Sequence, residues 1–110
     1  MNNQEKNTYV KKQILKTLLE LMKTEDFDSI TISHLVEKAE VGRASFYRNY
    51  QTKEDVLRQE AERLSGELND IRKNDNPNDY RLKLIRTLDF YKSNSDFYMT
   101  IYNAGLTQII

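Results

Sequence analysis

The sequence predicts an all-helical protein, because residues that break helices are few and apolar residues recur at helical spacing. Only three Gly and one Pro interrupt the 110 residues, and the alternation of β-branched and polar residues that is typical of strands is nearly absent. Val10, Ile14, Leu18 and Leu21 are three or four residues apart, which places them on one side of a helix. A chain of this length suits one compact domain, or one domain with part of a second.

Three helices are predicted in the amino-terminal half of the chain. The first covers roughly residues 8–24 and ends in an acidic, polar stretch, from which Phe27 and Ile30 are expected to point into a core. Thr31 is expected to cap a short second helix with its hydroxyl group. Residues 43–50 carry aromatic side chains at helical spacing and form a third short helix after a tight turn.

A long fourth helix is predicted to run from Thr52 to about Lys73. Thr52 and Asp55 have the spacing of a capping box, in which each side chain bonds the backbone N–H of the other residue. Five apolar residues then step by three or four positions: Leu57, Ala61, Leu64, Leu68 and Ile71. One side of this helix is therefore expected to face a core.

Residues 73–79 are the one stretch that resembles a linker, because polar turn formers surround the only proline. Beyond it, a fifth helix is indicated by four apolar residues at helical spacing: Leu84, Ile85, Leu88 and Tyr91. Ser95 or Asp96 is expected to cap a sixth helix. The sequence stops on two isoleucines without a polar tail, so we expect a truncated chain whose apolar end needs a partner.

Composition argues against an enzyme, a metalloprotein and a membrane protein. There is no Cys, so thiol chemistry is excluded. The single histidine, His34, has no second His or Cys nearby to complete a metal site and no nucleophile to serve as a catalytic base. The three glycines are far apart and cannot form a phosphate-binding loop. No apolar run approaches the length of a spanning helix. We therefore expect a cytoplasmic protein without cofactor or metal, in which His34 is a solvated or cap-adjacent residue.

A local excess of positive charge stands out in a chain whose 17 basic and 17 acidic residues balance. Residues 38–53 contain four basic side chains against the single acidic Glu40. Two short helices joined by a tight turn also form the scaffold that places a recognition helix in the major groove of DNA. On the second of these helices, Arg43 and Ser45 are positioned to reach base edges. The alternative interpretation is a solvated basic patch on a small helical bundle.

Phosphate contacts are predicted on the same helix and just beyond it. Tyr47, Arg48 and Lys53 have side chains that hydrogen-bond or neutralise backbone phosphates.

Four short motifs in order resemble the amino-terminal domain of TetR-type bacterial transcriptional regulators. They are I-T-I at residues 30–32, A-x-V at residues 39–41, S-F-Y-R-N-Y at residues 45–50 and T-K-E-D-V-L at residues 52–57. The resemblance covers about residues 8–60. It implies that Thr31 caps its helix and touches phosphate, that Arg43, Ala44 and Ser45 face bases, and that Tyr47 and Lys53 hold the DNA backbone.

The resemblance also implies the organisation of the rest of the protein. A three-helix helix-turn-helix DNA-binding domain would occupy residues 1–52, a connecting helix residues 53–73, and the start of a helical ligand-binding and dimerisation domain residues 74–110. Such proteins are homodimers that bind a palindromic operator in double-stranded DNA and respond to a small molecule, here unknown. Part of an effector pocket would be lined by Tyr91, Phe97, Tyr98 and Tyr102, although we expect most of these residues, with Met99, to be ordinary core.

Three residues depart from the family pattern. Glu40 stands where glycine is usual, so the backbone there either stays helical or is strained at positive φ. Gly42 replaces a capping Ser or Thr and loses one hydroxyl contact to phosphate. Asn49 stands where histidine is common, and its amide is still able to donate to phosphate.

Two functional hypotheses follow. The first is a sequence-specific DNA-binding regulator that is ligand-responsive in its full-length form. The second is a helical protein-protein interaction module that retains the fold without specific DNA binding, which the zero net charge and Glu40 encourage. The salt dependence of binding distinguishes the two hypotheses. The affinity for phosphates falls steeply as the salt concentration rises, whereas the affinity of an apolar helix contact changes little.

Overall fold

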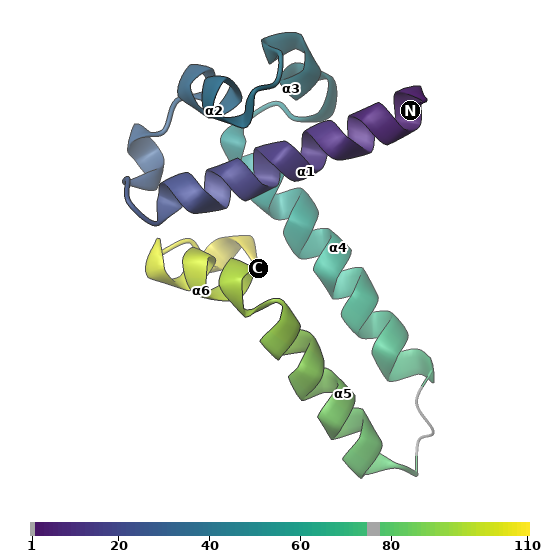
Figure 1. Cartoon of the computed structure of the whole chain (residues 1–110). Coiled ribbons are helices and arrows are strands. Elements are labelled where there is room, and N and C mark those ends of the chain that lie inside the picture. Colours follow the sequence, from purple (N-terminus) through teal and green to yellow (C-terminus); the bar gives the residue numbers. More distant parts are fainter. Residues whose placement is uncertain (1, 75–77) are drawn as a thin grey trace. The chain divides into compact units, whose positions relative to one another are not determined.

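A computed structural model describes residues 2–74 and 78–110, and all regular secondary structure in these ranges is helical (Figure 1). The α-helices are α1 (Asn3–Met22), α2 (Ile32–Ala39), α3 (Arg43–Asn49), α4 (Lys53–Asn74), α5 (Tyr80–Ser93) and α6 (Ser95–Asn103), with short 3-10 turns η1 (Phe27–Ser29) and η2 (Thr107–Ile109). The predicted all-α class is confirmed. The central part of the predicted linker, residues 75–77, lies outside the described residues.

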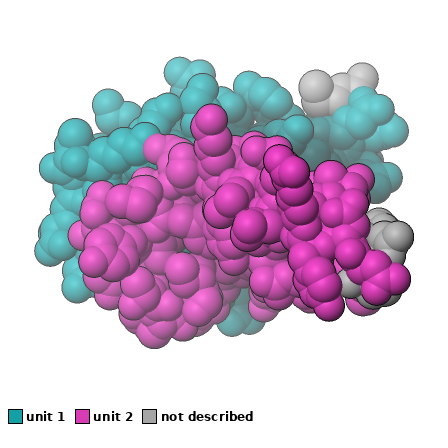
Figure 2. Space-filling model, turned by 90° about the horizontal axis from the view of Figure 1, so that it is seen from below, with its two compact units in different colours: residues 1–57 teal, residues 58–110 magenta. Residues whose placement is uncertain are grey.

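Two compact units divide the chain, one comprising Met1–Leu57 and the other Arg58–Ile110 (Figure 2). In the amino-terminal unit, α1 packs against both α2 and α3, and these two short helices pack against each other. In the carboxy-terminal unit, α5 packs against α6. The domain boundaries expected from the sequence, after residues 52 and 73, remain predictions.

The amino-terminal unit has an apolar core to which every one of its helices contributes. Ile14, Leu35, Phe46 and Leu57 are fully buried, and they come from α1, α2, α3 and the start of α4. Burial of such a side chain stabilises a fold by about 1.5–3 kcal/mol. Phe27 and Ile30, in and after η1, are also buried, as predicted.

Side-chain caps set the helix boundaries of this unit. The Thr31 hydroxyl accepts a hydrogen bond of 3.0 Å from the backbone N–H of His34 at the start of α2. At α4, the N–H of Asp55 donates to Thr52 over 3.2 Å and the N–H of Thr52 donates to the Asp55 carboxylate over 3.1 Å. Both predicted caps are therefore confirmed, and they fix where the chain enters α2 and α4.

Helix α1 begins earlier than the apolar pattern predicts. The N–H of Glu5 donates to the Asn2 side chain over 2.8 Å, and the Glu5 carboxylate accepts from the N–H of Asn2 over 3.3 Å. This capping box starts the helix at Asn3 rather than near residue 8. The added turns are polar, so apolar periodicity could not reveal them.

Glu40 ends α2 in the left-handed conformation, with φ 57° and ψ 42°. The N–H of Val41 reaches back to the carbonyl of Val36 over 3.1 Å, which closes the end of the helix. The sequence left two conformations open for Glu40, helical or positive φ, and the structure has the positive φ. A residue with a Cβ costs roughly 1–2 kcal/mol in this region.

Replacement of Glu40 tests this backbone cost. We expect Glu40→Gly to be more stable than Glu40→Ala by about 1 kcal/mol, because both variants remove the charge and only alanine keeps the Cβ that positive φ disfavours. Urea unfolding of the two variants measures the difference. Equal stability would show that the turn tolerates a Cβ without strain.

The carboxy-terminal unit buries a smaller set of apolar side chains, namely Leu64, Leu68, Phe90, Phe97 and Ile101. The apolar residues that predicted α5 are not among them. Leu84 and Leu88 are 58% and 59% exposed, and Ile85 and Tyr91 are also exposed. The prediction of the helix is confirmed, but Phe90, on another side of α5, is the residue that it buries.

The predicted cap of α6 is wrong. Asn94, rather than Ser95 or Asp96, occupies the N-cap position, and it makes no side-chain cap hydrogen bond. Its side-chain amide instead donates to the carbonyl of Phe90 over 2.9 Å at the end of α5. Asn94 thus serves both the end of α5 and the start of α6, and its side chain bonds the end of α5.

Candidate DNA-binding surface

Helix α3 presents two different faces. Phe46 is fully buried, and its ring lies 5.3 Å from the ring of Tyr47 and 5.5 Å from that of Tyr50, measured between centroids. The rest of its surface exposes Arg43, Ala44, Tyr47 and Arg48. A buried aromatic anchor thus fixes the helix in the unit while its polar face stays open to a partner.

Arg43 is held at the first turn of α3 by two neighbours. Its guanidinium donates a 2.8 Å hydrogen bond to the Ser33 hydroxyl on α2, and it lies 5.8 Å from the centre of the Tyr47 ring. Both contacts are exposed and restrict the side chain without burying it. The structure therefore brings together the predicted base-contacting arginine and the predicted phosphate-contacting tyrosine.

Thr31 and His34 lie at the start of α2. Thr31 is exposed, and its hydroxyl is engaged in the cap. The imidazole Nε2 of His34 lies 3.4 Å from the Glu25 carboxylate, in a partly exposed pair. His34 thus has a structural explanation beside the cap, in keeping with its predicted role.

Asn49 faces α1. It exchanges two hydrogen bonds with Asn7, of 3.0 and 2.9 Å, and its amide also donates to the carbonyl of Ser45 over 3.0 Å. These bonds use the amide that the sequence assigned to a phosphate. The pair joins the start of α1 to the end of α3, although the two residues are 42 positions apart.

Lys53 lies against the connection between α1 and α2. Its ammonium donates to the carbonyl of Phe27 and, over 2.9 Å, to that of Ile30, and it lies 4.4 Å from the centre of the Phe27 ring. The side chain is only partly exposed. Lys53 therefore ties the first turn of α4 to η1, and contact with a phosphate would use what remains of its donor capacity.

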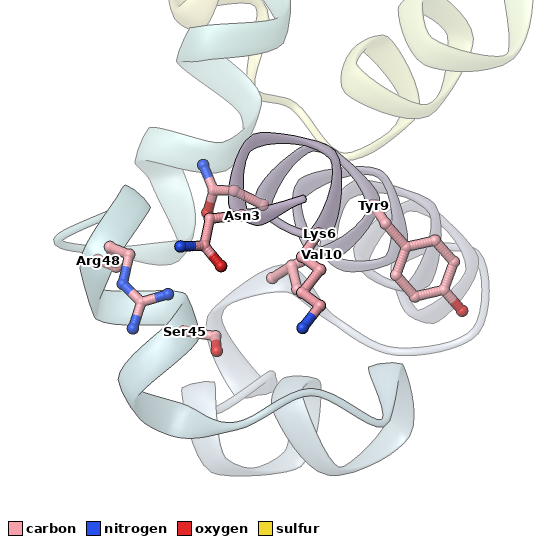
Figure 3. A pocket seen from close by; sticks show the side chains of 7 residues that line it. Asn3, Lys6, Tyr9, Val10, Ser45 and Arg48 are labelled. Atoms are coloured by element: carbon pink, nitrogen blue, oxygen red, sulfur yellow. The ribbon is translucent and has the colours of Figure 1, made fainter. Parts of the chain in front are cut away.

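A cavity of about 320 Å³ lies between the start of α1 and α3 (Figure 3). We call it the α1–α3 notch, and its lining residues are Asn3, Lys6, Asn7, Tyr9, Val10, Ser45 and Arg48. Ser45 and Arg48 were predicted to contact DNA, whereas Asn3, Lys6 and Asn7 were missed. Lys6 and Asn7 follow Asn3 by three and four residues, which places the three on one side of a helix. This spacing could have indicated a shared surface, but the residues are polar and form no apolar stripe.

The four candidate effector residues are only partly brought together. Tyr91 and Tyr98 have ring centroids 5.3 Å apart and line a cavity of about 390 Å³ with Leu68, Ile109 and others. Phe97 is buried, whereas Tyr102 is 66% exposed. The expectation that most of these aromatic residues are core is therefore wrong for Tyr91 and Tyr102, as it is for Met99.

Burial raises the pKa of the Tyr98 phenol above its ordinary value, and the neighbouring Tyr91, Glu60 and Glu67 raise it further. A tyrosine phenol is protonated at neutral pH in any case, and the raised pKa keeps that of Tyr98 a hydrogen-bond donor to a higher pH than usual.

Two further findings concern the described residues. They contain no group of three or more His, Cys, Asp or Glu side chains placed to hold a metal ion. None of their helices combines the length and the apolar character needed to cross a bilayer.

A tight pair of short helices, anchored on a third and exposing basic and aromatic side chains, defines a helix-turn-helix module. Residues 14–59 match the family model of bacterial regulatory proteins, tetR family. This part of the chain is thus a tetR-family helix-turn-helix DNA-binding domain, and proteins of that family are transcriptional regulators rather than enzymes. No curated protein and no solved structure matches the chain.

Proposed function

We propose that this protein binds a palindromic operator in double-stranded DNA by inserting α3 into the major groove. The observation that carries the proposal is the exposed face of α3, where Arg43 is held beside Tyr47 at the first turn of a helix anchored by buried Phe46. The first turn of a recognition helix is the part that reaches base edges in helix-turn-helix complexes.

Each predicted contact has a chemical role. Arg43 donates to guanine, Ser45 to either partner of a base pair, and Ala44 offers a methyl group to thymine. Thr31, Tyr47, Arg48, Asn49 and Lys53 are proposed to contact phosphates, which sets orientation and supplies the salt-dependent part of the affinity. Asn49 and Lys53 already make hydrogen bonds within the protein, so each would have to contact a phosphate in addition to these bonds or in exchange for one of them.

Dimerisation and ligand response are the finer parts of the proposal. A palindromic operator demands two recognition helices about 34 Å apart, so the protein would act as a homodimer. A small molecule bound near Tyr91 and Tyr98, for which Phe97 and Tyr102 remain further candidate contacts, would change that separation by favouring one conformation. The exposed leucines of α5 support a further apolar contact in this unit.

The test is a selection from fragmented genomic DNA at low and at moderate salt, with sequencing of the retained fragments. We expect enrichment of a short palindrome and an affinity that falls steeply as salt rises, because each neutralised phosphate releases counterions. Loss of the enrichment in Arg43→Ala would assign the readout to α3. Binding that is indifferent to salt, or capture of no duplex by the protein, would favour the protein-protein interaction module instead.

A further inference from the structure

The α1–α3 notch gathers positive charge without an acidic counterpart. Lys6 comes from α1 and Arg48 from α3, and no Asp or Glu is among the lining residues. Within the described residues, neither cation takes part in an ion pair, and both side chains are exposed. Two cations that share one cavity repel each other until an anion lies between them.

The notch also offers neutral hydrogen-bond donors. The amide of Asn3 and the hydroxyl of Ser45 line the same cavity. In Figure 3 the ammonium of Lys6 and the hydroxyl of Ser45 point to the same side of the notch, with the guanidinium of Arg48 beyond them. Two cations with the amide of Asn3 match an anion that has several oxygen acceptors.

The two walls of the notch are fixed relative to each other. The reciprocal Asn7–Asn49 hydrogen bonds join them, and the amide of Asn49 also holds the carbonyl of Ser45. A notch held by such a pair needs little reordering to receive an anion, which lowers the entropic cost of binding. Asn7 and Asn49 thus position the donors.

We propose that the α1–α3 notch binds one backbone phosphate of double-stranded DNA, with Lys6 and Arg48 as charged donors and the amide of Asn3 as a neutral one, while Ser45 at the edge of the notch stays with the bases. This inference rests on the proposed function, and it extends the DNA-binding surface from α3 to the start of α1. A DNA phosphate is the occupant because Ser45 and Arg48 belong to the helix that carries the base-reading residues, so a duplex on α3 brings its backbone to the notch. A phosphate contact fixes the register of the helix and carries no sequence information.

The test compares Lys6→Gln with Lys16→Gln in the full chain. Lys16 is also exposed and on α1, but it does not line the notch, so both variants lose one charge from the same helix. Affinities are measured for the selected duplex and for a scrambled duplex over a series of salt concentrations. Circular dichroism establishes that both variants keep the helicity of the parent.

We expect Lys6→Gln to weaken both duplexes by the same factor, roughly tenfold, because a charge-assisted contact to a phosphate is lost whatever the sequence. The slope of log affinity against log salt should fall by up to about one for each chain bound. Lys16→Gln should change neither quantity appreciably. If Lys6→Gln behaves as Lys16→Gln while the parent binds with a steep salt dependence, the notch inference fails alone; if the parent shows no such binding, the proposed function fails.

Discussion

Replacement of Phe46 by alanine is expected to destabilise the amino-terminal unit by about 3–5 kcal/mol. Phe46 is fully buried and its ring contacts those of Tyr47 and Tyr50. Truncation removes most of the apolar area that α3 buries and leaves a cavity among the helices. Since a domain is stable by only about 5–15 kcal/mol, this single change brings the unit close to unfolding.

Amide hydrogen exchange, resolved by residue, measures this effect where it occurs. In Phe46→Ala, protection should fall across α1, α2 and α3 together, because these helices pack on one another. The matched control is Tyr47→Ala, which truncates the adjacent aromatic residue on the exposed side of the same helix and should cost less than about 1 kcal/mol. Equal protection in the two variants would contradict the assignment of Phe46 as the anchor.

The contrast between these neighbours explains why this unit was predictable from sequence. Every helix of the unit presents apolar residues at helical spacing, and hydroxyl or carboxyl groups mark two of the starts, at Thr31 and Thr52. Such signals are local, since a cap and an apolar stripe depend on residues within a few positions of each other. The order of the helices and the position of the turn followed from them.

The features that escaped prediction depend on contacts distant in sequence or on backbone conformation. The Asn7–Asn49 pair joins residues 42 positions apart, so no local pattern announces it. The positive φ of Glu40 was one of two alternatives, because a glutamate there reveals only that the usual glycine is absent. On α5 the apolar stripe predicted the helix correctly, but Leu84 and Leu88 lie outside the core, since periodicity does not say which neighbour covers a face.

The double replacement Arg43→Ala with Tyr47→Ala is expected to abolish specific DNA binding while helicity is retained. A bidentate arginine contact to a base is worth about 1–3 kcal/mol, and loss of the tyrosine removes a phosphate contact and the ring that lies beside the guanidinium. The affinity for the selected operator should therefore fall by about two orders of magnitude or more. Electrophoretic mobility shift or fluorescence anisotropy with the operator and a scrambled duplex measures it.

Ser33→Ala distinguishes the two ways in which Arg43 could support specific binding, by contacting a base or by linking α2 to α3. Arg43 donates to the Ser33 hydroxyl, so the Arg43→Ala change also weakens the link between α2 and α3. Ser33→Ala breaks the same link but keeps the guanidinium, and it should lower affinity only a few-fold, through the entropy of an arginine that is no longer held in place. Preference for the operator over the scrambled duplex should persist in Ser33→Ala and vanish in the double variant. If Ser33→Ala loses the preference as fully as the double variant, Arg43 acts by holding the helices together; if the double variant keeps it, the bases are read elsewhere.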